Sequence, residues 1–90
     1  MFSVVCYDIS DDKRRIKVGK ILEGFGNRVQ RSVFECDIRP EHMKMLKQRL
    51  SKVLKDDDTV RYYYLCAQCI PKVQIVNGLP VTQAQLYFAV

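Results

Sequence analysis

The sequence predicts a single α+β domain, because segments with strand-like alternation are separated by segments with helical periodicity over a chain of 90 residues. Apolar residues repeat with period two near residues 2–9, 28–38 and 59–67. They recur at i, i+3, i+4 and i+7 in the two segments between. The resulting order predicts a ferredoxin-like βαββαβ sandwich, with both helices on one face of an antiparallel sheet. An apolar C-terminal segment predicts one additional strand.

The first strand is expected at residues 2–9 (FSVVCYDI), where β-branched and aromatic residues dominate. Because successive side chains point to opposite faces, Asp8 should share a face with Val4 and Cys6. Both faces of this strand are mostly apolar, so we expect both to be covered.

A helix should follow, because Ser10, Asp11 or Asp12 can cap its first turn. Gly26 is expected to end it. Its buried stripe is formed by apolar residues at helical spacing, namely Val18, Ile21, Leu22 and Phe25. Four cations fall mainly off this stripe and should remain available at the surface, namely Lys13, Arg14, Lys17 and Lys20.

Residues 28–38 should be extended, with Phe34 on the same face as Cys36 and Ile38. The alternation fails at residues 30–32, which predicts either two short strands or one bulged strand. Pro40 suits the first position of a second helix that runs to about residue 54. The apolar stripe of this helix is Met43, Leu46, Leu50, Val53 and Leu54.

The three aspartates at residues 56–58 are expected in a loop, since acids oppose a helix C-terminal dipole. A strand should follow at 59–67 and a weaker one at 72–76, before a turn at Asn77 and Gly78. The whole chain, 1–90, is expected to be one domain.

The chain is expected to form a homodimer. A domain of this size buries only about 60–65% of its unfolded surface, and several strands carry apolar residues on both faces. Two sheets packed face to face would cover the second face. The tail, residues 77–90, would then be exchanged onto the sheet edge of the partner subunit.

The composition favours an anionic partner. Lys and Arg number 15 against 10 acids, a net charge of +5, which suits nucleic acid or a membrane surface. The alternative is a soluble basic protein without such a partner. The apolar fraction of 48% excludes a disordered chain. No secretory signal and no apolar run of the ~18 residues of a membrane span is present, so we expect a cytoplasmic protein that does not cross a membrane.

Asp8 is the candidate metal ligand. Hard divalent cations such as magnesium take oxygen ligands, often one or two carboxylates with waters and phosphate oxygens. On a sheet face that meets a second copy, two Asp8 carboxylates could hold one ion near the two-fold axis. The alternative is a strand-end residue that caps the first helix, although Asp11 and Asp12 are better placed for that role.

Cations bracket Asp8 on the first helix and on the next strand. Arginine holds phosphate bidentately and lysine holds it as a point charge. This pattern predicts phosphate binding, and the alternative is a solvated helix face. The cations are Lys13, Arg14, Arg15, Lys17, Arg28 and Arg31.

Other residues carry weaker signals. Ser32 and Phe34 could supply a hydroxyl and an aromatic platform, but with one histidine no nucleophile–His–acid triad can be assembled. Cys66 and Cys69 spell C-x-x-C, which could bind zinc or act as a redox pair, with buried apolar thiols as the default. The tyrosines at 62–64 could stack bases in an RNA-recognition-type sheet, although strand aromatics are usually core.

Three segments in order resemble the family of CRISPR-associated protein two, the small partner of the CRISPR-associated integrase in spacer acquisition. They are YDISDDKRRIKV at 7–18, GNRVQRSVFEC at 26–36 and VRYYYLCAQC at 60–69. The resemblance implies a ferredoxin-like homodimer with exchanged C-terminal segments. It also implies a magnesium-dependent endonuclease (or one using another divalent cation) acting on single-stranded RNA or double-stranded DNA.

The resemblance implies a set of site residues. Asp8 would bind the metal, and Lys17 stands where family members carry arginine. We expect the nuclease activity to be weak and binding of spacer DNA with the integrase to be the principal role. A toxin-like RNA interferase and a ferredoxin-like nucleic-acid binder without chemistry are the alternatives. The implied catalytic positions are Tyr7, Asp8, Arg15, Lys17, Arg28, Ser32 and Phe34.

Overall fold

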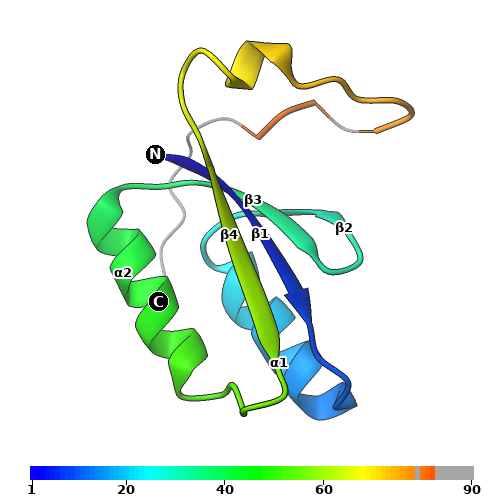
Figure 1. Cartoon of the computed structure of the whole chain (residues 1–90), viewed down its shortest axis with the longest axis vertical. Helices are drawn as coiled ribbons and strands as arrows, with labels where there is room; N and C mark the ends of the chain where they lie inside the picture. The colour runs from blue at the N-terminus through cyan, green and yellow to red at the C-terminus, as the bar shows by residue number, and fades with distance from the viewer. Residues whose placement is uncertain (79, 83–90) are drawn as a thin grey trace.

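The computed structural model describes residues 1–78 and 80–82, and its elements follow the predicted order β1-α1-β2-β3-α2-β4. The sheet order is β2-β3-β1-β4, and every neighbouring pair is antiparallel. Both helices lie behind the sheet in Figure 1 and leave its other face toward the viewer. The α+β ferredoxin-like sandwich is therefore confirmed.

Strand β1 (Phe2–Asp8) lies in the middle of the sheet, between β3 and β4. Its side chains alternate as predicted. Val5 and Tyr7 are buried toward the helices, Val4 and Cys6 are half-buried on the other face, and Asp8 is exposed. We call this second face, which no helix covers, the open face of the sheet.

Helix α1 (Asp12–Glu23) begins at Asp11, whose carboxylate accepts a hydrogen bond from the Arg14 backbone N–H at 2.9 Å. The prediction that Gly26 ends the helix is wrong, since Gly24 is the C-cap. Gly26 is needed for close packing, because a Cβ there would lie 2.6 Å from the Cys36 sulfur and would overlap a backbone carbonyl of the neighbouring strand.

Strands β2 (Asn27–Gln30) and β3 (Val33–Asp37) form a hairpin with a register shift between Arg28 and Gln30. Of the two predicted alternatives, two short strands or one bulged strand, the structure shows two short strands, the first of which carries the irregularity. Helix α2 (Pro40–Ser51) begins with proline as expected but ends before residue 54. Val53 and Leu54 nevertheless pack against the core from the loop that follows.

Strand β4 (Thr59–Leu65) is the edge strand beside β1. The weaker strand predicted at 72–76 is wrong. A 3₁₀ turn, η1 (Ile70–Lys72), overlaps only the first residue of this range, and residues 73–76 form neither helix nor strand. Pro71, just before the range, has no N–H to donate to a sheet. Figure 1 shows this segment beyond the end of the sheet, away from a strand that it could pair with. Asn77 has a φ of 56°, a left-handed conformation typical of the predicted turn.

The core lies between the helix-facing side of the sheet and the two helices. It includes the predicted stripes of α1 and α2 together with Val5, Phe34 and Cys36. The expected additional strand and most of the exchanged tail fall on residue 79 and residues 83–90, outside the described residues. Among the residues that the structure describes, no helix is long and apolar enough to cross a membrane.

Candidate functional site

Asp8 occupies the end of β1 on the open face, opposite Thr59 of β4. It lines a shallow hollow of about 170 Å³ together with Cys6, Tyr7, Thr59 and Arg61. The alternative that Asp8 caps α1 is wrong, since Asp11 does so. Within residues 1–78 and 80–82, no side chain or backbone group is paired with the Asp8 carboxylate. The carboxylate is thus accessible to a ligand from outside.

Arg61 is a candidate site residue that the sequence interpretation missed, since it lines the same hollow as Asp8. It is exposed on β4 directly opposite Cys6, and it therefore shares the open face with Asp8. Its guanidinium donates a hydrogen bond to the Tyr63 hydroxyl at 3.3 Å. The alternation in TVRYYYL, combined with pairing of the first and last strands, could have placed this cation near Asp8.

A metal ion at Asp8 needs ligands from beyond one chain. No group of three or more His, Cys, Asp or Glu side chains suited to a metal ion exists among the described residues. A single exposed carboxylate nevertheless fits a magnesium-type ion, which commonly keeps waters and binds one or two carboxylates. The donor set is therefore compatible with a shared site and not with one closed within the chain.

Tyr7, Arg28 and Phe34 form a cluster on the helix-facing side of the sheet, opposite Asp8. The Tyr7 and Phe34 rings stack with centroids 6.3 Å apart, and the Arg28 guanidinium lies 4.7 Å from the centroid of Phe34. Arg28 also donates to the Tyr7 hydroxyl at 3.3 Å. Because Phe34 is fully buried, the expectation that it supplies an aromatic platform is wrong.

The β2–β3 turn links this cluster to the Asp8 end of the sheet. The Ser32 backbone carbonyl accepts a hydrogen bond from the Tyr7 N–H at 3.0 Å. The Ser32 side chain is half-buried, and Arg31 beside it is exposed. The turn therefore brings Ser32 to the strand end that carries Asp8, whereas the Tyr7 ring remains in the core.

The expectation that Arg14 is available for phosphate is wrong. Its guanidinium makes a two-pronged ion pair with Asp58, with Nε–Oδ2 at 2.9 Å and Nη2–Oδ1 at 3.2 Å. The Asp58 side chain is only 1% exposed. The pKa of Asp58 is lowered, chiefly by the hydrogen bonds from Arg14. The hydrogen bond from the Lys55 N–H is the next cause. Arg14 thus joins α1 to the loop before β4.

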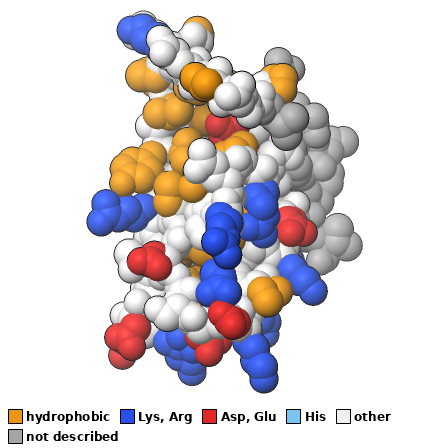
Figure 2. Space-filling view, turned by 90° about the vertical axis from the view of Figure 1, so that its right-hand side faces the viewer, with side chains coloured by type: hydrophobic (Ala, Val, Ile, Leu, Met, Phe, Trp, Pro, Cys, Tyr) orange, Lys and Arg blue, Asp and Glu red, His pale blue; other side chains and the backbone are white. Residues whose placement is uncertain are grey.

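Arg15 lies next to the end of β1. It donates to the Ile9 carbonyl at 3.3 Å, one residue after Asp8, and pairs with the exposed Asp12 at 2.6 Å. Lys13, Lys17 and Lys20 are exposed on α1, as predicted. In Figure 2, Lys and Arg side chains gather over the middle and lower part of the face that carries β2 and α1.

The default interpretation of Cys66 and Cys69 as buried thiols is wrong, since both are exposed. Tyr63 and Tyr64 are also about half exposed, and only Tyr62 of these three packs against the core. Cys66, Cys69 and Tyr63 are exposed because no described element covers the open face of the edge strand β4 or the turn after it. Tyr64 lies on the helix-facing side, where it lines a groove beside α2.

Comparison with known proteins agrees with this geometry. A family model described as CRISPR associated protein Cas2 matches residues 1–73. A CRISPR-associated endoribonuclease Cas2 of Chloroflexus aurantiacus is 45% identical over 82 residues, covering 89% of this chain and 88% of that protein. Another from Synechocystis is 41% identical over 81 residues, covering 89% and 88%.

Two solved structures share the fold. Streptococcus pyogenes Cas2 is similar with a TM-score of 0.76 and 31% identity, covering 86% of this chain and 100% of that one. A chain of a partial Cas6-RT-Cas1–Cas2 complex is similar with a TM-score of 0.77 and 29% identity, covering 92% and 98%.

Proposed function

This chain belongs to the Cas2 family of CRISPR-associated proteins, and on that premise we propose that it acts in CRISPR adaptation as a homodimer that binds nucleic acid and partners the CRISPR-associated integrase. A weak endonuclease activity that depends on a divalent metal accompanies this role. The relatives named as endoribonucleases support the activity, and the similar chain in a Cas1–Cas2 complex supports the partner. The observation that carries the proposal is the accessible Asp8 carboxylate beside Arg61 on the open face.

The proposed metal is magnesium, held between the Asp8 carboxylates of two subunits. When bound, such an ion lowers the pKa of its water and stabilises charge on a phosphate. The Asp8 carboxylate of each chain would supply one oxygen ligand. Arg61 lies two residues along the paired strand and would neutralise a phosphate oxygen, while Arg15 holds the chain that follows Asp8 through the Ile9 carbonyl. One carboxylate per subunit is a sparse site, which is why we expect slow cleavage.

The proposed dimer joins the open faces of two sheets. Val4, Cys6 and Val33 are half-buried on this face and Tyr63 is 48% exposed, so apolar surface remains to be covered. Figure 2 shows apolar side chains gathered in the upper left of the molecule. Packing two such faces would bring the two Asp8 strand ends toward a common axis.

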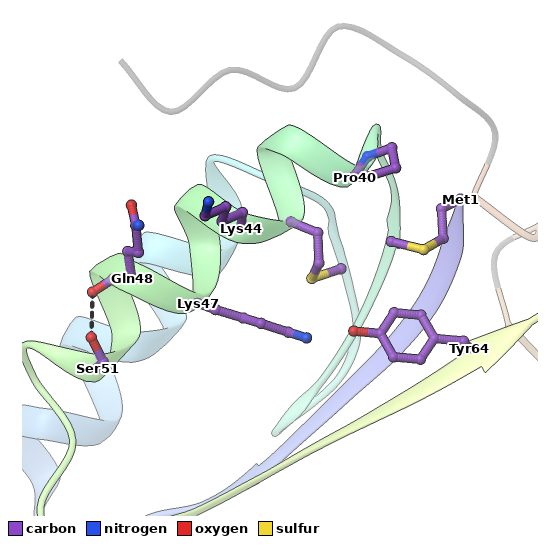
Figure 3. A pocket seen from close by; sticks show the side chains of 8 residues that line it. Met1, Pro40, Lys44, Lys47, Gln48, Ser51 and Tyr64 are labelled. Atoms are coloured by element: carbon purple, nitrogen blue, oxygen red, sulfur yellow. Dashed lines mark hydrogen bonds between the residues drawn. The ribbon is translucent and has the colours of Figure 1, made fainter.

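The tail, residues 77–90, is proposed to add to the free edge of the partner's β4. A groove of about 560 Å³ runs along this edge between α2 and β4. Figure 3 shows Lys47 extending from α2 toward Tyr64 of β4, with Met1 and Pro40 at one end. Met43 adds apolar surface to the groove. An apolar segment pairing with β4 would place side chains here.

Phosphate binding is proposed for four exposed cations and for the half-buried Arg15, and not for Arg14. Each phosphate neutralised by a cation steepens the salt dependence of duplex binding, by about 0.9 in the log–log slope. Spacer DNA would be held this way without base preference, and RNA is proposed as a second substrate. The proposed contacts are Lys13, Arg15, Lys17, Arg28 and Arg31.

The nuclease proposal is tested by magnesium titration of cleavage of matched single-stranded RNA and double-stranded DNA. Asp8→Asn should lower the rate about a hundredfold or more and leave the dimer intact by size-exclusion chromatography. Asp56→Asn is the matched control, because Asp56 is an exposed loop carboxylate. This variant should cleave both substrates at the wild-type rate. Unchanged cleavage by Asp8→Asn would refute the assignment.

The binding proposal is tested separately, by duplex affinity against salt concentration. Lys17→Ala should weaken binding equally for unrelated sequences and lower the slope by about one. Lys44→Ala removes the same charge from α2, in the groove beside β4, and should leave the slope unchanged. A slope that Lys17→Ala does not alter, or a strong base preference, would contradict phosphate binding by α1.

A further inference from the structure

The C-x-x-C segment forms a tight turn at the end of β4. The Cys69 N–H donates to the Cys66 carbonyl at 3.0 Å, and the Ile70 N–H donates to the same carbonyl at 3.2 Å. This turn brings the two sulfur atoms to 3.3 Å from each other. Both thiols are exposed to solvent. Two reactive groups are thus held side by side at the surface, within reach of a small molecule.

The two thiols are not equivalent. The pKa of Cys66 is lowered, chiefly by a hydrogen bond from the Cys69 thiol and then by the backbone N–H groups of Cys69 and Gln68. The pKa of Cys69 is raised, because its thiol is the donor to Cys66. Burial raises the pKa of Cys36 to about 12. Cys66 is therefore suited to act as the nucleophile, whereas Cys36 is not.

We propose that Cys66 and Cys69 form a reversible dithiol–disulfide pair, a modification site at the turn through which the chain leaves β4. The Cys66 thiolate attacks one sulfur of a small disulfide such as oxidised glutathione, and one glutathione thiolate leaves. Cys69 loses its proton to water and attacks the Cys66 sulfur in the mixed disulfide, which releases the second glutathione. Two cysteine thiols are oxidised, and one glutathione disulfide is reduced to two thiols.

A dithiol fits these observations better than a zinc site. A structural zinc ion needs four ligands, and Cys66 and Cys69 supply two. In the part of the chain that the structure describes, no third or fourth His, Cys, Asp or Glu joins them in a group that could hold a metal. The redox step needs only the two sulfurs that the turn already brings together.

The disulfide would fix the direction in which the C-terminal segment departs. η1 begins at Ile70 directly after the turn, and Figure 1 shows the chain bending away past the end of the sheet. The segment returns to the sheet at Thr82, whose N–H donates to Glu35 at 3.0 Å and whose hydroxyl accepts from Asn27 at 3.1 Å. Oxidation would therefore stiffen one end of this segment without touching Asp8 or the basic surface.

The test uses the reduced full-length chain, equilibrated with oxidised and reduced glutathione. Wild type should lose two of its four free thiols, and peptide mapping should show a bond between Cys66 and Cys69. Cys69→Ser should instead accumulate a mixed glutathione disulfide at Cys66. Cys66→Ser should react more slowly than Cys69→Ser, because more backbone N–H groups favour the thiolate at Cys66 than at Cys69. Cys6→Ser is the matched control and should still form the disulfide.

Amide hydrogen exchange gives a second readout. Exchange should slow across the turn and η1 when wild type is oxidised, and it should remain unchanged in Cys69→Ser under the same conditions. The proposal is overturned by four free thiols under fully oxidising conditions, or by glutathionylated wild type without the internal bond. It is equally overturned by a disulfide between two chains, or by thiols that react only after a chelator removes bound zinc.

Discussion

Replacing Phe34 separates a core role from a nucleic-acid-binding role more directly than any other change in the molecule. The family resemblance places this residue in the site, but the ring is fully buried on the helix-facing side of the sheet. It stacks with Tyr7 and lies under the Arg28 guanidinium. We therefore expect substitutions at Phe34 to act on stability, with binding altered only as far as the fold is lost.

The expected magnitudes follow from these contacts. Phe34→Ala removes a fully buried ring and should cost about 3–5 kcal/mol of unfolding free energy. For a domain of this size, each kcal/mol shifts the melting temperature by about 4–8 °C, so the melting temperature should fall by at least about 12 °C. Phe34→Leu keeps most of the volume but loses the aromatic pair and the cation–π contact, which together contribute about 1–2 kcal/mol.

The assay combines thermal unfolding by circular dichroism with duplex binding measured well below the melting temperature. Phe25→Leu is the matched control, because Phe25 is also buried, at 1% exposure, but follows the C-terminal end of α1, whereas Asp8 precedes its N-terminal end. Both leucine variants should melt earlier and bind DNA with wild-type affinity once folded. Our reasoning is refuted if Phe34→Leu melts like wild type yet loses binding, while Phe25→Leu retains it.

Two further predictions concern packing and charge. The Arg14–Asp58 pair holds the pKa of Asp58 below its ordinary value of 3.8, so its contribution to stability is complete above that pH and is lost as the pH falls through the folded-state value. The free energy of unfolding, measured with urea from about pH 6 down to about pH 2, should fall less in Asp58→Asn than in wild type. An equal fall in the two proteins would contradict this. Gly26→Ala should unfold at a clearly lower urea concentration than Gly19→Ala. The new Cβ meets the Glu35 backbone carbonyl at position 26, which cannot move without the strand, whereas at position 19 it meets the ends of two side chains, Arg28 and Tyr7. A larger loss at Gly19 would show that the contact at Gly26 can relax.

Local patterns were sufficient to predict the fold. Period-two alternation located β1 and β4, helical spacing located α1 and α2, and Pro40 marked a helix start. Each of these signals depends on a residue and its near neighbours. The errors arose where the structure depends on contacts with residues distant in the sequence. Gly26 resembles a helix stop, but the contact that requires glycine comes from β3.

The candidate site was predicted less completely, because it depends on contacts between distant segments. Arg14 and Asp58 are 44 residues apart, and neither local pattern shows that they pair. Arg61 was missed for the converse reason, since its closeness to Asp8 follows only from the pairing of β1 with β4. Asp8 was identified because its exposure depends on simple alternation along one strand.

The sheet itself divides the residues that the family motif groups together. Tyr7 and Asp8 are adjacent in sequence, yet they point to opposite faces, and the Tyr7 cluster with Arg28 and Phe34 supports the strand that Asp8 ends. A shared motif is therefore explained by two physical roles. One set of residues, Tyr7 and Phe34, fixes the position of the strand end, and the other meets the ligand, with the exposed Arg28 contacting the first set while remaining open to a phosphate. Loss of activity on mutation of the first set should follow loss of stability, whereas Asp8→Asn should abolish cleavage in a protein that unfolds like wild type.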